Sequence, residues 1–228
     1  MAERLEDLQF EGLKIFQDDK GYCFTSDSVL LANYSKFLAG SKVVEFCAGS
    51  GVISILLSKK QKPKSIHAFE IMEKPYELFK RSVEFNNLED KVFPINDRLE
   101  NAVAILGVGY ADVVVCNPPY LKTNEQYNKN STLSEVAKTE LLTTLESVVE
   151  NAEKLLKFGG KLFMVHRTDR LVDVLSVLRN YKIEPKKLTI IHPNEKSEPV
   201  VFLVEAHKGG KMGLKVSKLT FATEYNKA

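Results

Sequence analysis

The chain has 228 residues, of which 44% are hydrophobic and 27% are charged, and its formal net charge at pH 7 is +2. This composition is ordinary for a soluble globular domain with a large core, and the small net charge does not by itself indicate a nucleic-acid-binding protein. The first residues lack an apolar signal core and no run is long enough to span a bilayer. We therefore expect a cytoplasmic protein without a membrane partner.

The first residues of the chain show no clean period. Residues 5–16 mix apolar and charged side chains, which predicts either a hairpin or a helical lid. A helix over residues 28–37 follows, and Asp27 stands where its N-cap is expected.

We expect a single domain over residues 1–228. Its parts are a cap on the substrate side (1–40), a core (41–207) and a basic tail (208–228).

A glycine turn joins an apolar strand at residues 43–46 to a helix with an apolar face. Gly49 and Gly51 allow the backbone to come close to a ligand, at a helix N-terminus whose N–H groups are unpaired. A glycine pair alone is a weak signal, but the strands that follow add to it.

Two further apolar strands, at residues 65–69 and 92–96, each end at an acid. Glu70 lies about 20 residues after the glycine turn, as dinucleotide-type sites require, and it could accept both hydroxyls of a ribose. A solvated acid at a strand end is the alternative. Asp97 ends the next strand, where its carboxylate could meet an adenine amino group.

The β-branched run at residues 111–116 ends in Asn117, Pro118, Pro119 and Tyr120. The residue before each proline is held extended, so the Pro118 carbonyl stands at a defined angle beside the Asn117 side chain. Two acceptors that face one spot suit an NH2 group, and the Tyr120 ring could lie against a planar substrate. A structural Pro-Pro turn is the alternative.

The remaining elements predict an α/β fold with a parallel sheet and an antiparallel edge strand. Residues 121–132 are polar without a period, and we expect a substrate loop or a tolerated surface insertion. A helix from Ser134 is expected to end at Gly159-Gly160. Strands at 161–165, 187–191 and 200–206 and a helix at 171–178 complete the chain.

Neither the cysteines nor the histidines form a recognisable reactive or metal-binding motif. We expect the cysteines to be reduced core residues and expect no metal. The residues concerned are Cys23, Cys47, Cys116, His67, His166, His192 and His207.

This ordered set resembles the class I S-adenosylmethionine-dependent methyltransferases over residues 10–207. The resemblance implies a Rossmann-like, doubly wound and mostly parallel seven-stranded sheet with an antiparallel edge strand. It also implies S-adenosylmethionine as cofactor, an acid-x-Gly-x-Gly-x-Gly loop with Cys47 in place of the first glycine, and an Asn-Pro-Pro-Tyr catalytic motif. The implied cofactor-binding residues are Glu45, Cys47, Gly49, Gly51, Glu70, Ile71, Asp97 and Asn117, and the implied catalytic residues are Asn117, Pro118, Pro119 and Tyr120.

Within that class, residues 21–32, 136–140 and 166–171 look like segments of bacterial tRNA1(Val) adenine-N6 methyltransferases. This likeness implies a tRNA partner and methylation of N6 of adenine 37 beside the anticodon, and among oligomeric states we favour a monomer. It implies substrate contacts from Phe24, Asp27, Tyr120, Lys122 and Arg167. Residues 182–228 hold nine Lys and five Glu, which suits phosphate binding or a plain solvated surface.

Two other functions remain open from the sequence. The Asn-Pro-Pro-Tyr motif suits other planar NH2 targets equally well, namely a release-factor glutamine, a ribosomal RNA guanine or a DNA adenine. A module that binds cofactor or RNA without catalysis is the alternative from a different class. Intact Asn117 and Tyr120 argue against it.

Overall fold

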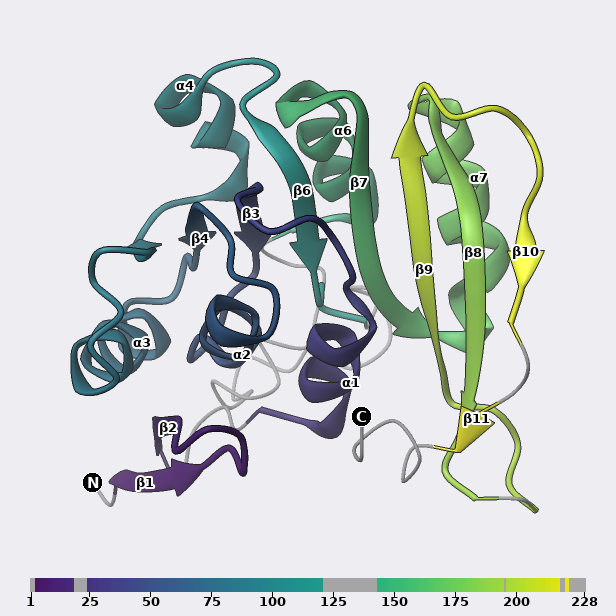
Figure 1. The fold of residues 1–228 in the computed structure, drawn as a ribbon. Coiled ribbons are helices and arrows are strands. Elements are labelled where there is room, and N and C mark those ends of the chain that lie inside the picture. The colour runs from purple at the N-terminus through teal and green to yellow at the C-terminus, as the bar shows by residue number, and fades with distance from the viewer. Residues whose placement is uncertain (1–2, 19–23, 121–142, 195, 218–219, 222–228) are drawn as a thin grey trace, which may run out of the picture.

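The computed structural model describes residues 3–18, 24–120, 143–194, 196–217 and 220–221 (Figure 1). Its main sheet has the strand order β10-β8-β9-β7-β6-β3-β4-β5, and β11 pairs with β8. All pairs are parallel except those of β9, which runs antiparallel to both β7 and β8. The strands are β3 (Lys42–Phe46), β4 (Ser65–Phe69), β5 (Val92–Ile95), β6 (Ala111–Cys116), β7 (Leu156–Arg167), β8 (Ile183–His192), β9 (Val201–Lys208), β10 (Lys215–Val216) and β11 (Thr220–Phe221).

Helices cover both faces of this sheet (Figure 1). One core cluster joins the sheet to α1 (Ser26–Tyr34), α2 (Val52–Lys60) and α3 (Glu73–Phe85). The opposite cluster joins it to α4 (Ala102–Leu106), α6 (Leu145–Leu155) and α7 (Leu171–Asn180). Central strands packed on both faces need apolar residues at consecutive positions, and Val113, Val114 and Val115 of β6 are accordingly all buried.

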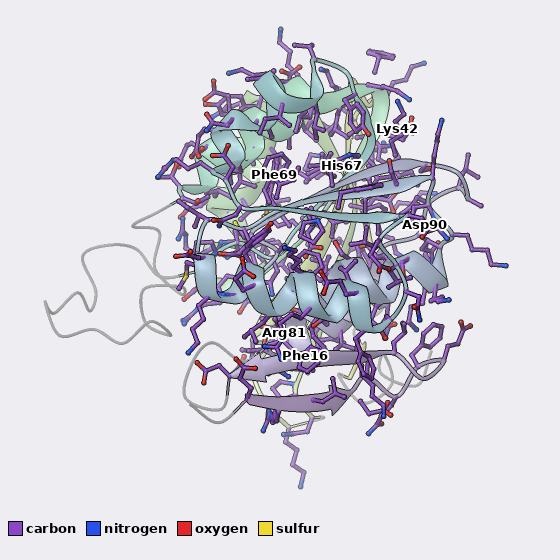
Figure 2. All side chains as sticks on the ribbon, turned by 90° about the vertical axis from the view of Figure 1, so that its left-hand side faces the viewer. Phe16, Lys42, His67, Phe69, Arg81 and Asp90 are labelled. Carbon is purple, nitrogen blue, oxygen red and sulfur yellow. The ribbon has the colours of Figure 1, made fainter. Side chains whose placement is uncertain are left out.

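The amino-terminal segment forms a hairpin, so the hairpin alternative for this region is correct. Strands β1 (Glu3–Asp7) and β2 (Lys14–Asp18) make a separate two-stranded sheet. Phe16 packs edge-on against Phe85 of α3, and the Arg81 guanidinium lies 4.3 Å from the centre of the Phe16 ring (Figure 2). The hairpin is therefore fixed to the outer side of α3 rather than built into the main sheet.

Two helix boundaries differ from the predicted ones. Helix α1 begins at Ser26 after an N-cap at Thr25, so the prediction of Asp27 as the N-cap is wrong and Asp27 lies in the first turn. The prediction of one helix from Ser134 to Gly159 is wrong for the described residues. Helix α6 begins only after Thr144, whose side chain accepts the Ser147 N–H at 3.1 Å. Residues 121–142, which include the predicted substrate loop, lie outside the described residues.

The end of α6 also differs, because the chain passes from Leu155 directly into β7. Gly159 and Gly160 lie within that strand, where the register of β6 against β7 shifts between Ala111 and Val113. Gly159 has φ +78°, so this glycine serves an irregularity in the strand rather than a helix end.

The predicted count of seven strands is too low for the described part of the chain. Seven longer strands are present, and the two-residue strands β10 and β11 add to them along β8. Both fall in the predicted basic tail, where short polar segments show no alternating pattern. Since β10 and β11 run parallel to β8, the chain after β9 turns back towards the carboxyl ends of the parallel strands.

Candidate active site

The residues predicted to bind ligands gather at the carboxyl ends of the central strands. Phe46 of β3 pairs with Phe69 of β4 and with Cys116 of β6, and Phe69 pairs with Ile95 of β5. Residues 47, 70, 96 and 117 each follow one of these aligned positions. One edge of the sheet therefore carries the glycine loop, both acids and the Asn-Pro-Pro-Tyr motif, where open α/β sheets bind ligands.

Close packing between helices fixes the glycine at the start of α2. Gly51 is the N-cap of α2 and has φ +87°. A Cβ atom built there would lie 1.9 Å from Cδ2 of Phe79 on α3. Only glycine fits both the backbone angle and this contact, and the amino end of α2 is thereby brought to the edge of the sheet with its N–H groups facing the loop.

Glu70 joins β4 to the glycine loop. Its Oε2 accepts the Gly49 N–H at 2.7 Å, and its Oε1 accepts the Met72 N–H at 2.8 Å. Burial raises the pKa of this carboxyl, and the hydrogen bonds from Met72 and Gly49 oppose that rise. Each carboxylate oxygen has a further lone pair, so the group holds the loop and still has acceptor capacity for a ligand hydroxyl.

Glu45 lies beneath the same loop with one oxygen unsatisfied. Its Oε2 accepts the Ser54 hydroxyl, while Oε1 has no hydrogen-bond partner among the described residues. Burial raises the pKa of Glu45 to about 8, so the carboxyl is mainly protonated at neutral pH. A buried polar atom without a partner fits a site that a polar ligand completes.

Cys47, which stands where the resembling loop has its first glycine, adopts φ +57°. A side chain in this left-handed region costs on the order of 1–3 kcal/mol. The thiol is half-buried and packs against the core cluster on the α6 side of the sheet.

Asp97 is held in place by its neighbours after β5. Its Oδ1 accepts the Arg98 N–H at 2.7 Å and the Asn101 amide at 2.8 Å. The adjacent Asn96 donates to the Glu70 carbonyl at 2.9 Å, which joins the ends of β5 and β4. Asp97 is half-buried, as is Ile71. A planar group lying along this edge would meet both.

Contacts from α1 orient the Asn117 amide. Its Nδ2 donates to the Ser28 hydroxyl at 3.0 Å, so its Oδ1 faces the Tyr120 hydroxyl, which hydrogen-bonds to it. The Tyr120 hydroxyl also lies 3.4 Å from Oδ2 of Asp27. Burial raises the pKa of Asp27, while hydrogen bonds from Tyr120 and Thr25 lower it. The acceptor of Asn117 is therefore directed to the Tyr120 side, and its second lone pair can accept a ligand N–H.

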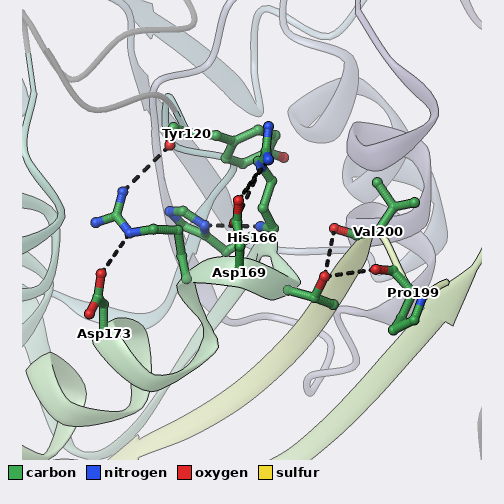
Figure 3. A network of polar contacts seen from close by, with 9 residues as sticks. Tyr120, His166, Asp169, Asp173, Pro199 and Val200 are labelled. Carbon is green, nitrogen blue, oxygen red and sulfur yellow. Dashed lines mark hydrogen bonds and ion pairs between the residues drawn. The ribbon is translucent and has the colours of Figure 1, made fainter. Parts of the chain in front are cut away.

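Two residues at the end of β7 support Tyr120 and were missed as individual site residues (Figure 3). The fully buried His166 ring lies 5.1 Å from the Tyr120 ring, centre to centre, and its Nδ1 accepts the Arg167 N–H at 2.9 Å. Burial, with Arg170 nearby, lowers the pKa of His166 to about 4, so the ring is neutral. Arg170 donates to the Tyr120 carbonyl at 3.5 Å and to Asp173 at 2.8 Å. The sequence signal for this stretch was the likeness of residues 166–171 to a segment of the resembling family.

The other predicted substrate residues are only partly brought to the site. The Phe24 side chain packs against the core, and its N–H donates to Gln17 at 3.1 Å. Arg167 is exposed and forms an ion pair with Asp169 at 2.6 Å. Pro118 is buried and Pro119 half-buried, and the described chain contains no cis peptide bond. Lys122 lies outside the described residues.

This fold is that of the Rossmann-like methyltransferases. The solved structure of M. jannaschii TYW2 in complex with AdoMet superposes with a TM-score of 0.61 at 16% identity, covering 90% of this chain and 86% of that one. Residues 24–181 match the family model described as Methyltransferase small domain, and the chain belongs to this family.

The relatives found by sequence similarity include enzymes named for two kinds of target. A tRNA1(Val) (adenine(37)-N6)-methyltransferase of Flavobacterium johnsoniae is 26% identical over 191 residues, which are 83% of this chain and 80% of the relative. A release factor glutamine methyltransferase of Thermodesulfovibrio yellowstonii is 24% identical over 132 residues, 55% of this chain and 46% of that relative. The first similarity extends over most of both chains, whereas the second does not.

The described residues contain no group of three or more His, Cys, Asp and Glu side chains placed to hold a metal ion. None of the helices described is both long and apolar enough to cross a membrane.

Proposed function

We propose that this protein is an S-adenosylmethionine-dependent N-methyltransferase that methylates N6 of adenine 37 in tRNA1(Val). The observation that carries the reaction type is the orientation of Asn117, whose amide oxygen accepts a hydrogen bond from the Tyr120 hydroxyl at the same sheet edge as the glycine loop. The similarity to the Flavobacterium johnsoniae enzyme, which extends over most of both chains, supports the choice of substrate.

The strand ends fit the proposed cofactor. Glu70 has lone pairs left for ribose hydroxyls, Asp97 and Ile71 would flank a planar base, and Oε1 of Glu45 has no hydrogen-bond partner among the described residues. S-adenosylmethionine, when bound, supplies a methyl group on a positively charged sulfur.

The protein would contribute alignment rather than covalent attack. The Asn117 Oδ1 and the Pro118 carbonyl would each accept a hydrogen bond from one N–H of the target NH2, which favours a pyramidal nitrogen with its lone pair available for methylation. Tyr120 offers a stacking face for a base that has left its stack, and His166 and Arg170 hold that residue in place. The amine proton leaves late, to solvent.

The lysine-rich carboxyl-terminal region supports RNA binding less than its charge suggests. Lys208 forms an ion pair with Glu153 at 2.9 Å at the end of β9, on the opposite edge of the sheet from Asn117. The RNA path proposed here therefore uses Arg167 and Lys122 beside the motif. We further propose a cytoplasmic monomer with one domain over residues 1–228.

A test of this proposal uses a strain that lacks the protein. Its total tRNA, incubated with the purified enzyme and S-adenosylmethionine and then digested to nucleosides, should gain N6-methyladenosine at position 37 of tRNA1(Val). Wild-type tRNA, already modified, should gain none. Methylation of other positions only, or of no RNA, would contradict the proposed substrate.

The second candidate is methylation of a glutamine side chain in a release factor. It is favoured by the similarity to the Thermodesulfovibrio yellowstonii enzyme and by the equal fit of an amide NH2 between Asn117 and Pro118. Incubation with release factor in the same assay separates the two, because the methylated glutamine appears in the protein fraction.

A further inference from the structure

Two cysteines lie side by side where the glycine loop meets the Asn-Pro-Pro-Tyr motif. Cys116 ends β6, and its Cα is paired with that of Phe46, the residue before Cys47. Cys47 packs against the core cluster that contains Cys116. Burial, followed by the contact with the Cys47 side chain, raises the pKa of the Cys116 thiol well above its ordinary value.

The backbone separation suits a covalent bond between them. Ideal spacings between adjacent strands (about 4.8 Å) and between consecutive Cα atoms (about 3.8 Å) would put the two Cα atoms about 6 Å apart, within the ~4.4–6.8 Å that a disulfide requires. Cys47 is half-buried and Cys116 is fully buried. An oxidant thus reaches the pair from the Cys47 side, and Cys116 is placed to resolve the oxidised thiol.

The backbone at Cys47 has an unfavourable conformation for a residue with a side chain. Cys47 holds φ +57°, a left-handed conformation that glycine adopts without strain. Backbone strain of this kind clusters at functional sites, which fits a role for the Cys47 thiol in the ligand loop. Its place between Glu45 and Gly49 means that any pull on Cys47 is transmitted to the Gly49 N–H, which donates to Glu70.

We propose that Cys47 and Cys116 form a reversible disulfide that weakens cofactor binding, an inference that rests on the proposed function for the identity of the cofactor. The bond would draw the glycine loop towards β6 and displace the Gly49 N–H from Glu70. It would also tie down the residue directly before Asn117. Oxidation would then switch off both halves of the site at once.

A peroxide is the oxidant in this reaction. The Cys47 sulfur attacks one peroxide oxygen, the O–O bond breaks, and the thiol proton leaves with the departing oxygen as water. The Cys116 sulfur then attacks the Cys47 sulfenic acid, the S–S bond forms, the S–O bond breaks, and the hydroxyl leaves with the Cys116 proton as a second water. Both sulfurs are oxidised and the peroxide is reduced.

The test is carried out on the purified full chain, which has three cysteines. Hydrogen peroxide should lower the number of alkylatable thiols from three to one, and peptide mapping should recover Cys47 linked to Cys116. Calorimetry with S-adenosylhomocysteine should give roughly tenfold weaker binding after oxidation, the equivalent of one lost charge-assisted hydrogen bond, with recovery in dithiothreitol.

Matched variants separate the pair from general oxidation. The ratio of affinities before and after peroxide should be one for Cys116→Ala and for Cys47→Ser, whereas Cys23→Ser should respond as the wild type does. Thiols that stay unlinked, or a linked pair with unchanged affinity, would overturn the inference. Failure of the reduced protein to bind S-adenosylhomocysteine would instead overturn the proposed function and the proposed effect of oxidation on cofactor binding. The number of alkylatable thiols would still show whether the disulfide forms.

Discussion

The two halves of the candidate site are built differently. At the ends of β3, β4 and β5, the acids bond to backbone N–H groups of nearby turns, as Glu70 does with Gly49 and Met72. At the end of β6, side chains from α1, β6 and β7 hold one another, as Asn117 does with Ser28 and Tyr120. The cofactor half is therefore fixed by the local fold, whereas the substrate half depends on contacts between distant segments.

This difference predicts different responses to mutation. In the cofactor half, disruption of the backbone geometry should affect folding and ligand binding together. In the substrate half, removal of a single side chain should alter turnover while leaving the fold and the cofactor affinity in place, because no backbone contact of the sheet is lost.

The largest expected effect tests the backbone of the cofactor half. Gly51→Ala should lower the free energy of unfolding by about 2–5 kcal/mol, because it adds a clash with Phe79 to an unfavourable φ. Gly40→Ala is the matched control, since Gly40 has φ +80° with nothing within 4 Å of a built Cβ, and it should cost about 1–2 kcal/mol. Equal losses in urea denaturation would contradict the packing argument.

The next effect tests the substrate half. Asn117→Ala should lower turnover roughly a hundredfold or more through the loss of an aligning acceptor, while S-adenosylmethionine affinity stays near that of the wild type. Ser28→Ala, which frees the Asn117 amide to rotate, should have a smaller effect in the same direction. Kinetics and calorimetry on both variants measure this, and near-normal turnover of Asn117→Ala would remove Asn117 from the chemistry.

A smaller effect is expected at the link between β4 and the glycine loop. Glu70→Ala should weaken S-adenosylmethionine binding by about 1–3 kcal/mol, because it removes charged hydrogen bonds to the ligand and to Gly49. Calorimetry gives the affinity directly. Binding as tight as that of the wild type would place the ribose elsewhere.

The smallest effect concerns pH and Glu45. The unfolded carboxyl ionises near its ordinary pKa of 4.5, whereas the folded one stays protonated to about 8. The unfolded chain therefore binds fewer protons between these values, so stability falls as pH rises from 4.5 to 8. Relative to Glu45→Gln, the wild type should lose on the order of 1–2 kcal/mol between pH 5 and pH 6.5. Exposed Glu77→Gln is the control, and parallel curves for all three proteins would contradict the burial of an acid.

The strand ends of the cofactor half could be located from the sequence because their signals are local. The glycines, the strand ends and the spacing to Glu70 follow from patterns within a few residues, and the parallel register then brings them together. The same holds for the succession of the seven longer strands along the chain. The predicted start of a helix was wrong where a single side chain determines the boundary, as Thr144 does for α6.

The substrate half could be predicted only in part. Asn117 and Tyr120 were evident from the rigid motif, but the roles of Ser28, His166 and Arg170 depend on contacts across 46 to 89 residues of sequence, which no local pattern encodes. Strands β10 and β11 were missed for a similar reason, since only pairing with β8 makes these short segments into strands.

Methyl transfer to a defined RNA tests the central claim most directly. Labelled S-adenosylmethionine is incubated with the enzyme and an unmodified tRNA1(Val) transcript, beside a transcript that carries guanine at position 37. The account predicts label in the first transcript, recovered as N6-methyladenosine, and none in the second or with Asn117→Ala. Equal labelling of both transcripts, or label only in a glutamine-bearing release factor, would contradict it.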